Sequence, residues 1–345
     1  MYDIAIIGLG PAGATLARLL NKRYKVIAVN YTKSSGKCCG GLLSPDAQKL
    51  LAKFDITVPK NVLVDPQIFS VRTIDFDNDT ERYYQRFYVN MNREKFDEYL
   101  ISLIPDSVKL ETGLCTNIAK IESGYELDIK VGSDLKKIKS KIIVGADGAN
   151  SIVRNTFYRK NKIKKYVAIQ EWYKDINSLP FYSCIFDKRI TDSYAWTISK
   201  DNNFIIGGAF PVDDCNSRFS ELVDKCKNRG IKFGNKIKRE GCYVYITNNL
   251  FNIISGSNNS YLVGEAAGFI SPSSLEGISY GISSASILAE CVNKSVDGVA
   301  NRYFRKTFKL RLKVLFKILK RPFMYNRFLR KLIMLSGVKS INKYR

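Results

Sequence analysis

The chain has 345 residues, with 55 Lys and Arg against 32 Asp and Glu and a net charge of +23, and it contains no histidine. The lack of histidine excludes Ser-His-Asp triads, Cys-His pairs, His-ligated zinc and a histidine general base, so a cofactor must supply any difficult chemistry. No uncharged apolar run reaches about 18 residues, the N-terminus has no basic segment typical of an export signal, and the eight cysteines are irregularly spaced. We therefore expect a cytoplasmic protein with reduced thiols, no membrane span and no metal site. No nucleic-acid-binding motif accompanies the positive charge, so no nucleic-acid partner is expected.

The chain opens with a predicted strand, tight turn and helix. Residues 4–7 form a short apolar run that is typical of a buried strand, and residues 14–20 have helical spacing. Between them lies a G-x-G-x-x-G pattern formed by Gly8, Gly10 and Gly13. Its first glycine allows a sharp exit from the strand, the second leaves room for a pyrophosphate, and the third lets the helix pack closely. The pattern predicts a dinucleotide at the helix N-terminus, without distinguishing FAD from NAD; the alternative is a glycine-rich turn that binds nothing.

A second strand is predicted over residues 24–30. It ends at Asn30, where dinucleotide sites usually have an Asp or Glu that binds ribose, although an amide can also bond a hydroxyl. A loop with adjacent cysteines follows, Lys37-Cys-Cys-Gly-Gly-Leu-Leu-Ser-Pro45, and leads into a helix predicted over residues 46–54.

The middle of the chain alternates between two-residue and helical periodicity. Strands are predicted at 67–76 and 82–90, a helix at 92–104, and a β-meander between 108 and 144. Two-residue periodicity returns from 166 to 247, with strands at 181–186, 194–200 and 204–210 and a helix at 219–228. Because no linker separates these segments, we expect interleaved domains.

Two further motifs place a carboxylate after a buried strand. Residues 142–145 form an apolar strand that ends in Ala146-Asp147-Gly148 and turns into a helix. Another strand ends in Gly264-Glu265-Ala-Ala-Gly268, and a long helix begins after Gly277 and Ile278. In a parallel sheet such strand ends lie where ligands bind.

The last part of the chain is basic and amphipathic. No acidic residue follows Asp297, whereas residues 302–345 contain 15 Lys and Arg. Apolar residues follow helical spacing among them: Phe304, Phe308, Leu312, Leu315 and Leu319. Pro322 is expected to end this helix, before a second apolar helix that runs to Leu335. These helices either contact an anionic membrane peripherally, at its inner face, or pack on their own protein with a solvated basic face.

Together and in this order, the glycine motif and the two acidic motifs resemble those of FAD-dependent oxidoreductases of the para-hydroxybenzoate hydroxylase type. Within that group the chain resembles the geranylgeranyl reductase family, through the segment 37–45 and the pattern Tyr194-x-Trp196-x-x-x-Lys200. It is similar from end to end to the CbrA-type flavoproteins of that family, including the segments 67–71, 181–187 and 264–270.

The resemblance implies an α/β fold. A Rossmann-like FAD-binding domain (residues 1–65, 91–160 and 255–297) would be interleaved with an antiparallel β substrate domain (66–90 and 161–254). Basic C-terminal helices would occupy residues 298–345.

The resemblance also implies a role for individual residues. The FAD pyrophosphate would be held by Gly8, Gly10, Ala12 and Gly13, with Arg93 on the phosphate side and Asn30 in place of the acidic ribose ligand. The pyrophosphate and ribityl chain would lie near Asp147, Gly148 and Glu265. Gly277 and Ile278 would offer N–H groups to the flavin N1–O2 edge, at a helix N-terminus that stabilises negative charge on the reduced flavin.

Five more residues are implied around the flavin ring. Cys39, Gly40 and Gly41 would lie beside the ring, and Cys39 is either a small residue that lets the loop pass or a proton donor. Tyr194 and Trp196 would form a wall of an apolar substrate channel. Their spacing puts them on one face of a strand, where ordinary core packing is the alternative.

The implied activity is the reduction of carbon–carbon double bonds in an isoprenoid or polyprenyl lipid by hydride transfer from reduced flavin. NAD(P)H or a reduced redox protein would be the electron donor. Two alternatives stay open: a FAD-dependent monooxygenase acting on an aromatic or lipid substrate, and a flavoprotein that binds a lipid carrier without turnover.

Overall fold

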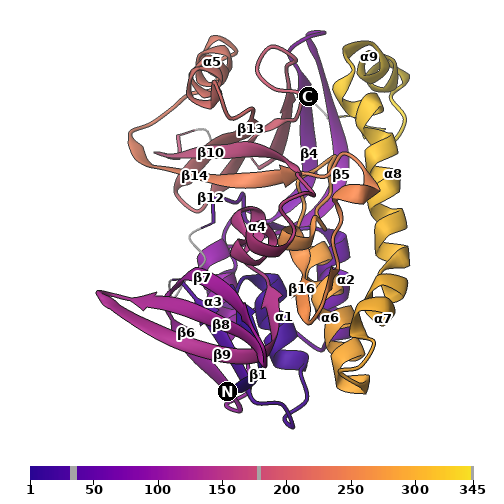
Figure 1. Ribbon diagram of the computed structural model, residues 1–345. Coiled ribbons are helices and arrows are strands. Elements are labelled where there is room, and N and C mark those ends of the chain that lie inside the picture. Colours follow the sequence, from indigo (N-terminus) through magenta and orange to yellow (C-terminus); the bar gives the residue numbers. More distant parts are fainter. Residues whose placement is uncertain (32–36, 177–179, 343–345) are drawn as a thin grey trace. The chain divides into compact units, whose positions relative to one another are not determined.

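The computed structural model describes residues 1–31, 37–176 and 180–342. It divides into two compact units, each built from three segments of chain (Figure 1). Unit 1 comprises residues 1–36, 94–164 and 245–318, and unit 2 comprises residues 37–93, 165–244 and 319–345. Each unit contains its own sheet, which confirms the predicted α/β fold with an interleaved antiparallel domain.

Unit 1 contains a parallel sheet in the order β16-β9-β1-β2-β6. Its strands are β1 (Tyr2–Ile7), β2 (Val26–Asn30), β6 (Val108–Thr112), β9 (Asp134–Gly145) and β16 (Ser260–Leu262), with β15 (Gly256–Ser257) antiparallel at the edge. Ile4 lies between Val26 of β2 and Ile142 of β9. The apolar runs of β1 and β2 are buried, as expected for strands that are covered on both faces.

Strand β9 pairs with different strands along its two halves. Its second half joins the parallel sheet, and its first half pairs with an antiparallel meander of β7 (Leu114–Ile121) and β8 (Gly124–Val131). Unit 1 also contains α1 (Pro11–Leu19), α3 (Arg93–Ser102), α4 (Ile152–Phe157) and α6 (Ile278–Lys294), the short turns η2 (Gly148–Asn150), η3 (Leu250–Asn252) and η4 (Gly264–Ala267), and the first part of the C-terminal helices. A methyl group on Gly281 of α6 would lie 3.4 Å from the Cβ of Ala12, so α1 and α6 pack closely.

Unit 2 contains a mainly antiparallel sheet in the order β14-β10-β13-β12-β11-β4-β5-β17. The strands are β4 (Ile68–Asp75), β5 (Thr80–Asn90), β10 (Lys164–Lys174), β11 (Tyr182–Phe186), β12 (Ala195–Lys200), β13 (Asn203–Phe210), β14 (Lys236–Ile246) and β17 (Ser340–Ile341). Helix α5 (Cys215–Asn228) packs Phe219 and Leu222 on one face of this sheet, against Ile206 and Phe210 of β13. Unit 2 also contains the short elements α2 (Pro45–Lys53) and η1 (Lys60–Val62).

Residues 37–65 cluster with unit 2, whereas the sequence grouped them with the FAD-binding segments. The physical reason is strand β3 (Leu42–Leu43), which pairs with β5 and so ties this stretch to the antiparallel sheet. Likewise, the C-terminal helices do not form a separate part: residues 298–318 cluster with unit 1 and residues 319–345 with unit 2.

The C-terminal region forms α7 (Val299–Lys306), α8 (Phe308–Tyr325) and α9 (Arg327–Ser336). The expectation that Pro322 ends a helix is wrong, because α8 continues to Tyr325. Proline lacks an N–H and so removes one hydrogen bond from the helix, but the carbonyl oxygen of Pro322 still accepts from the N–H of Asn326 at 2.9 Å, and the helical turn continues past it. The break comes at Asn326, whose side chain accepts hydrogen bonds from the N–H groups of Phe328 and Leu329 and so starts α9. Among the described helices, none combines the length and the hydropathy that a bilayer crossing requires.

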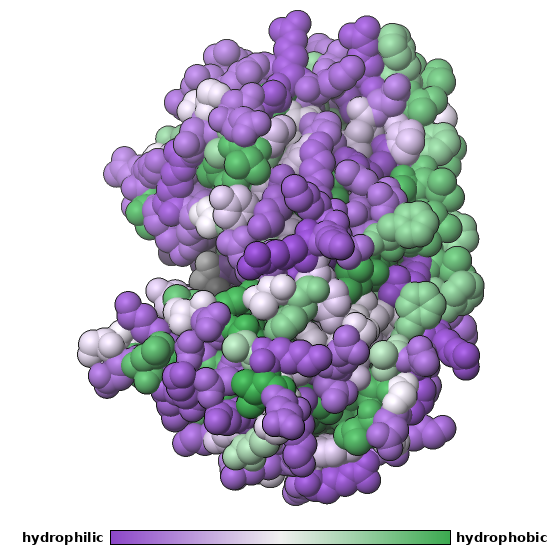
Figure 2. Space-filling model, in the orientation of Figure 1, coloured by the Kyte–Doolittle hydropathy of each residue, from purple (hydrophilic) through white to green (hydrophobic). Residues whose placement is uncertain are grey.

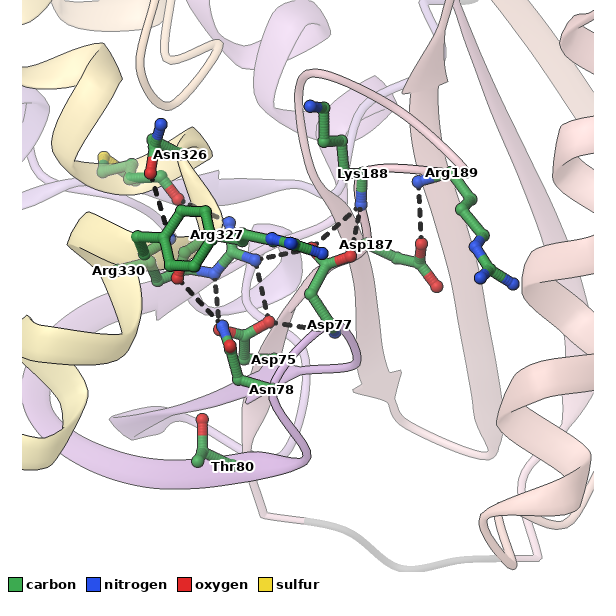
Figure 3. A network of polar contacts seen from close by, with 12 residues as sticks. Asp75, Asp77, Asn78, Thr80, Asp187, Lys188, Arg189, Asn326, Arg327 and Arg330 are labelled. Carbon is green, nitrogen blue, oxygen red and sulfur yellow. Dashed lines mark hydrogen bonds and ion pairs between the residues drawn. The ribbon is translucent and has the colours of Figure 1, made fainter.

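A buried ion-pair network attaches α9 to the sheet of unit 2 (Figure 3). Arg330 donates through Nε and Nη2 to the two carboxylate oxygens of Asp75 at the end of β4, at 2.7 and 2.8 Å, and through Nη2 to Asp77 at 2.6 Å. Its Nη1 donates to the carbonyl oxygen of Met324 at 2.9 Å. The basic residues of this region are therefore not all on a solvated face.

Candidate functional site

The glycine motif and both acidic motifs converge in unit 1, at the carboxyl ends of three neighbouring parallel strands. β16, β9 and β1 are adjacent, and each is followed by one of the motifs. A methyl group on Gly8 would lie 2.7 Å from the carbonyl oxygen of Ala146 and 2.9 Å from the Cα of Asp147. One on Gly148 would lie 3.7 Å from Oε2 of Glu265, and one on Gly264 would lie 3.0 Å from the Cβ of Ala12. The three motifs, which are more than a hundred residues apart in the sequence, therefore lie next to one another.

The three glycines of the first motif have different surroundings. Gly8 has a positive φ of 94°, and a methyl group on Gly13 would overlap the carbonyl oxygen of Gly8, so both positions are sterically restricted. By contrast, a methyl group on Gly10 would meet no atom within 4 Å. Gly10 is the N-cap residue of α1, so the open space lies at a helix N-terminus, where backbone N–H groups favour an anion.

Asp147 combines a bonded and an unbonded carboxylate oxygen. Its Oδ2 accepts a hydrogen bond from the N–H of Ile152 at 2.7 Å. Its Oδ1 is shielded from solvent and has no hydrogen-bond partner among the described residues. Burial raises the pKa of Asp147 to about 6, against the hydrogen bonds from Ser151 and Ile152 that favour its charged form. A buried acceptor without a donor is costly, so this oxygen is poised for a ligand hydroxyl or N–H.

Glu265 is buried in the turn η4. Its Oε1 accepts a hydrogen bond from the N–H of Tyr245 at 3.0 Å. The same turn is supported from α4 by Arg154, which donates to the carbonyl oxygen of Ala266 at 3.0 Å and to that of Asn252 at 2.8 Å. The carboxylate therefore stands on a rigid turn.

The N-terminus of α6 begins at the predicted residues Gly277 and Ile278. Within the described residues, the N–H groups of these two residues donate no hydrogen bond. The next N–H, that of Ser279, donates to Oε1 of Glu276 at 2.8 Å. The first turn of this 17-residue helix thus keeps two donors for a ligand.

Asn30 and Arg93 stand at element ends. Oδ1 of Asn30, the last residue of β2, accepts a hydrogen bond from the N–H of Leu9 at 3.2 Å, so this side chain supports the glycine turn directly. Arg93 is the first residue of α3 and is half-buried. Arg93 is the last residue of a unit 2 segment, and the rest of α3 belongs to unit 1.

The loop with adjacent cysteines lies in unit 2, beside β12. The N–H of Gly41 donates to Sγ of Cys39 at 3.4 Å, and Nε2 of Gln170 donates to the carbonyl oxygen of Cys39 at 3.5 Å. A methyl group on Gly40 would lie 2.7 Å from Cδ1 of Ile198, so the loop contacts the strand closely. Cys38 is buried, and a hydrogen bond with Cys242 together with burial raises the pKa of its thiol well above the ordinary value.

Lys200 fixes this loop, and the sequence analysis gave it no role. Its ammonium donates to the carbonyl oxygens of Gly41 (3.1 Å) and Met91 (2.6 Å) and to Oδ1 of Asn90 (2.6 Å). Burial lowers its pKa to about 7, although neighbouring Cys39 and Asp201 favour the charged form. The sequence did contain a signal for this residue. Lys200 lies four residues after Trp196 in a predicted strand, so the two side chains share one face of that strand.

Tyr194 and Trp196 are neighbours, as their spacing predicts. Their ring centroids are 5.7 Å apart, and both side chains are buried. A methyl group on Gly207, directly across from Trp196 on β13, would lie 2.6 Å from the indole, so the glycine makes room for the ring. Nε1 of Trp196 is shielded from solvent and has no partner among the described residues.

The predicted residues therefore fall into two groups. In unit 1 the structure brings together Gly8, Gly10, Ala12, Gly13, Asn30, Asp147, Gly148, Glu265, Gly277 and Ile278. In unit 2 it brings together Cys39, Gly40, Gly41, Tyr194 and Trp196, to which Lys200 is added.

Comparison with known proteins gives relatives along the whole chain, although no family model matches. Protein CbrA of Shigella sonnei (strain Ss046) is 45% identical over 346 residues, covering 99% of this chain and 98% of that protein. A solved geranylgeranyl bacteriochlorophyll reductase-like protein from Thermoplasma acidophilum has a TM-score of 0.79 at 18% identity, covering 96% of this chain and 90% of the other. PqsL of Pseudomonas aeruginosa, described as a probable FAD-dependent monooxygenase, has a TM-score of 0.71 at 14% identity, covering 98% and 99%. The chain thus has the fold seen in FAD-dependent oxidoreductases.

Proposed function

The chain belongs to the CbrA family, and we propose that it is a FAD-dependent oxidoreductase that reduces carbon–carbon double bonds of an isoprenoid or polyprenyl lipid. The observation that carries the proposal is the convergence of Gly10, Asp147 and Glu265 at adjacent strand ends in unit 1. Three motifs at one edge of a parallel sheet suit a ligand that is long enough to contact all of them, as a dinucleotide is.

The residues present fit FAD. The open space over Gly10 at the N-terminus of α1 suits the pyrophosphate, because the N–H groups there offer hydrogen bonds and a partial positive charge. The unpartnered Oδ1 of Asp147 suits a ribityl hydroxyl. The donors of Gly277 and Ile278 suit the N1–O2 edge of the ring, where the helix dipole stabilises the reduced anion.

When bound and reduced, the flavin supplies a hydride, and the chain must provide a proton and a dry apolar surface. The aromatic pair Tyr194 and Trp196 supplies apolar surface in unit 2. Cys39 is the proposed proton donor, since the chain has no histidine and the N–H of Gly41 holds the sulfur in place. Hydride and proton together saturate one double bond, and NAD(P)H or a reduced redox protein is the proposed source of the electrons.

A flavin monooxygenase is the second candidate. It is favoured by the similarity in fold to PqsL, which matches over nearly the whole of both chains. In that case oxygen, and not an alkene, would accept the electrons, and the same FAD-binding residues would serve.

An anaerobic experiment separates these activities. The purified protein is loaded with FAD, reduced with dithionite and mixed with polyprenyl lipid without oxygen, while the flavin absorbance is followed. A reductase reoxidises and yields saturated lipid. Reoxidation only after oxygen is admitted, with a hydroxylated product, supports the monooxygenase, and lipid binding without electron transfer shows a non-turnover carrier protein.

The FAD site itself is tested by filling the space over Gly10. Gly10 has φ −67° and ψ −172°, which other residues adopt, so Gly10→Leu should fold normally yet lose FAD binding. Gly241→Ala in unit 2, at an exposed position where the nearest atom is 3.6 Å away, is the matched control and should bind FAD as the parent does. Undiminished FAD affinity in Gly10→Leu would place the cofactor elsewhere.

A further inference from the structure

Helix α8 has apolar residues on two opposite faces. Leu310 and Val314 are buried on the inner face, where Arg311 donates to the carbonyl oxygen of Ile253 at 3.2 Å and to Oγ of Ser255 at 2.6 Å. At 3.6 residues per turn, the opposite side of the helix carries Phe308, Phe316, Leu319 and Phe323. All four are exposed, and Phe316 keeps 67% of its surface accessible.

Helix α9 repeats this arrangement. Arg330 and Met334 are buried on its inner face, whereas Phe328, Leu332 and Leu335 are exposed on the other side. We call these three residues and the four of α8 the outer stripe. In Figure 2 apolar side chains follow the right margin, where Figure 1 draws α8 and α9. Exposed apolar groups arranged in this way along helices mark an interaction surface.

Every charged side chain of α8 and α9 is basic, because no acidic residue follows Asp297. Arg311 and Arg330 are used internally, whereas the side chains of Lys309 and Lys331 are exposed. An apolar face between exposed lysines combines two contributions to binding at a lipid interface: burial of rings in the acyl boundary and attraction to anionic head groups.

We propose that the outer stripe of α8 and α9 docks the protein peripherally on the surface of an anionic lipid bilayer. Phenylalanine and leucine side chains would enter the head-group boundary, while the lysines contact the phosphates. A second copy of this chain is a poorer occupant, because a symmetric contact would place the same basic residues opposite one another without any acidic partner.

Co-sedimentation of the purified full-length protein with vesicles tests this proposal. The protein should sediment with vesicles that contain phosphatidylglycerol and much less with pure phosphatidylcholine. Binding should weaken between about 0.1 M and about 1 M salt, as screening shortens from about 10 to about 3 Å. Phe316→Ser/Leu319→Ser should lose about tenfold or more of the affinity, and Lys309→Gln/Lys331→Gln should lose about fivefold for each lysine removed.

The matched control is Leu135→Ser, because Leu135, the second residue of β9, is 60% exposed and Leu319 is 58% exposed. This control should bind vesicles as the parent does, and circular dichroism should show all variants folded. Failure of the parent protein to sediment with anionic vesicles overturns the proposal. So does undiminished binding by Phe316→Ser/Leu319→Ser, or a dimer in size-exclusion chromatography that this variant abolishes. The assay has no flavin readout, so its result is independent of the proposed function.

Discussion

At the scale of single residues, Lys200 is an internal cross-link of unit 2. One ammonium joins the cysteine loop, through Gly41, to the end of β5, through Asn90 and Met91. The loop is also held by the pairing of β3 with β5 and by the N–H of Met91, which donates to the carbonyl oxygen of Gly41 at 2.9 Å. The position of Cys39 therefore depends on a side chain 161 residues further along the chain.

We predict that Lys200→Met destabilises the protein. Methionine fills a similar volume but leaves Oδ1 of Asn90 and the carbonyl oxygen of Met91 without the Lys200 donor, while the carbonyl oxygen of Gly41 keeps the N–H of Met91 at 2.9 Å. Two buried acceptors without a donor cost about 2–5 kcal/mol in the free energy of unfolding. Urea denaturation followed by fluorescence measures the loss. Lys174→Met, at an exposed position in β10, is the control and should change the midpoint little. Equal midpoints for the two variants would show that Lys200 does not hold the loop.

The carboxyl of Asp147 gives a prediction about pH. Its folded-state pKa is raised to about 6 by burial, above an unfolded value of about 3.9. The folded apoprotein therefore carries a cost above about pH 6, which disappears as pH falls toward about 4 because only the folded state gains a proton in that interval. Asp147→Asn should stabilise the apoprotein by about 2–3 kcal/mol near pH 8, from a shift of about two pKa units at about 1.4 kcal/mol each, and by well under about 1 kcal/mol near pH 4.

Urea denaturation of the FAD-free protein at the two pH values measures this difference. The same substitution should weaken FAD binding, because an amide nitrogen at the position of Oδ1 cannot accept a hydrogen bond from a hydroxyl group. A stability gain that is the same at both pH values would show that the carboxyl does not titrate as described.

At the scale of elements, Arg330 makes the buried ion pairs that attach α9 to the sheet of unit 2, beside the hydrogen bond from Nε of Arg82 to the carbonyl oxygen of Met334. Arg330 and Asp75 are 5% and 0% exposed, and Asp77 shares the same guanidinium. We predict that Arg330→Met costs about 3–5 kcal/mol, because it leaves a buried carboxylate unpaired. Lys331→Met, at the adjacent exposed position, should cost little.

Thermal unfolding and limited proteolysis of residues 326–342 would measure these effects. Arg330→Met/Asp75→Asn should be less destabilised than the sum of its two single variants, since the second change removes the unpaired charge. Additive losses would mean that the pair contributes nothing beyond its separate parts.

The same helices show what the sequence could and could not predict. Helical spacing correctly indicated helices over most of residues 299–336, but it could not tell which of two apolar faces is the inner one. Of the residues singled out, Phe304, Phe308 and Leu319 are exposed and Leu312 and Leu315 are half-buried, while Leu310 and Val314 make the inner face. Leu310 and Val314 are flanked by basic residues, so the sequence did not indicate that they form the buried face of the helix. Arg311, on the same face, donates a hydrogen bond to Ser255.

The glycine and acidic motifs were predictable because each is local: a strand, a turn and a helix within about twenty residues. Their convergence followed from the rule that ligands bind at the carboxyl ends of parallel strands. Lys200 was not assigned a role because its partners, Gly41 and Asn90, are more than a hundred residues away. The position of residues 37–65 depended in the same way on the pairing of β3 with β5.

At the scale of the whole molecule, the chain passes between two units that each have their own sheet. The motifs assigned to the cofactor belong to unit 1, whereas the cysteine loop and the aromatic pair belong to unit 2. FAD binding should therefore raise the stability of unit 1 more than that of unit 2. This difference in stability is measurable without knowing the substrate.

We predict that FAD protects unit 1 from hydrogen exchange more than unit 2. At about 100 times its Kd, a ligand that binds only the folded state adds about 2.7 kcal/mol to the stability of the structure that binds it. Peptides covering 4–20, 146–154 and 264–282 should show the largest protection, because they contain the residues proposed to contact the cofactor. Peptides from β10, β13 and α5 in unit 2 serve as the internal control. Protection confined to unit 2, or absent from all three unit 1 segments, would refute the assignment of the site, since no dinucleotide held by Gly10, Asp147 and Glu265 could leave those backbones unchanged.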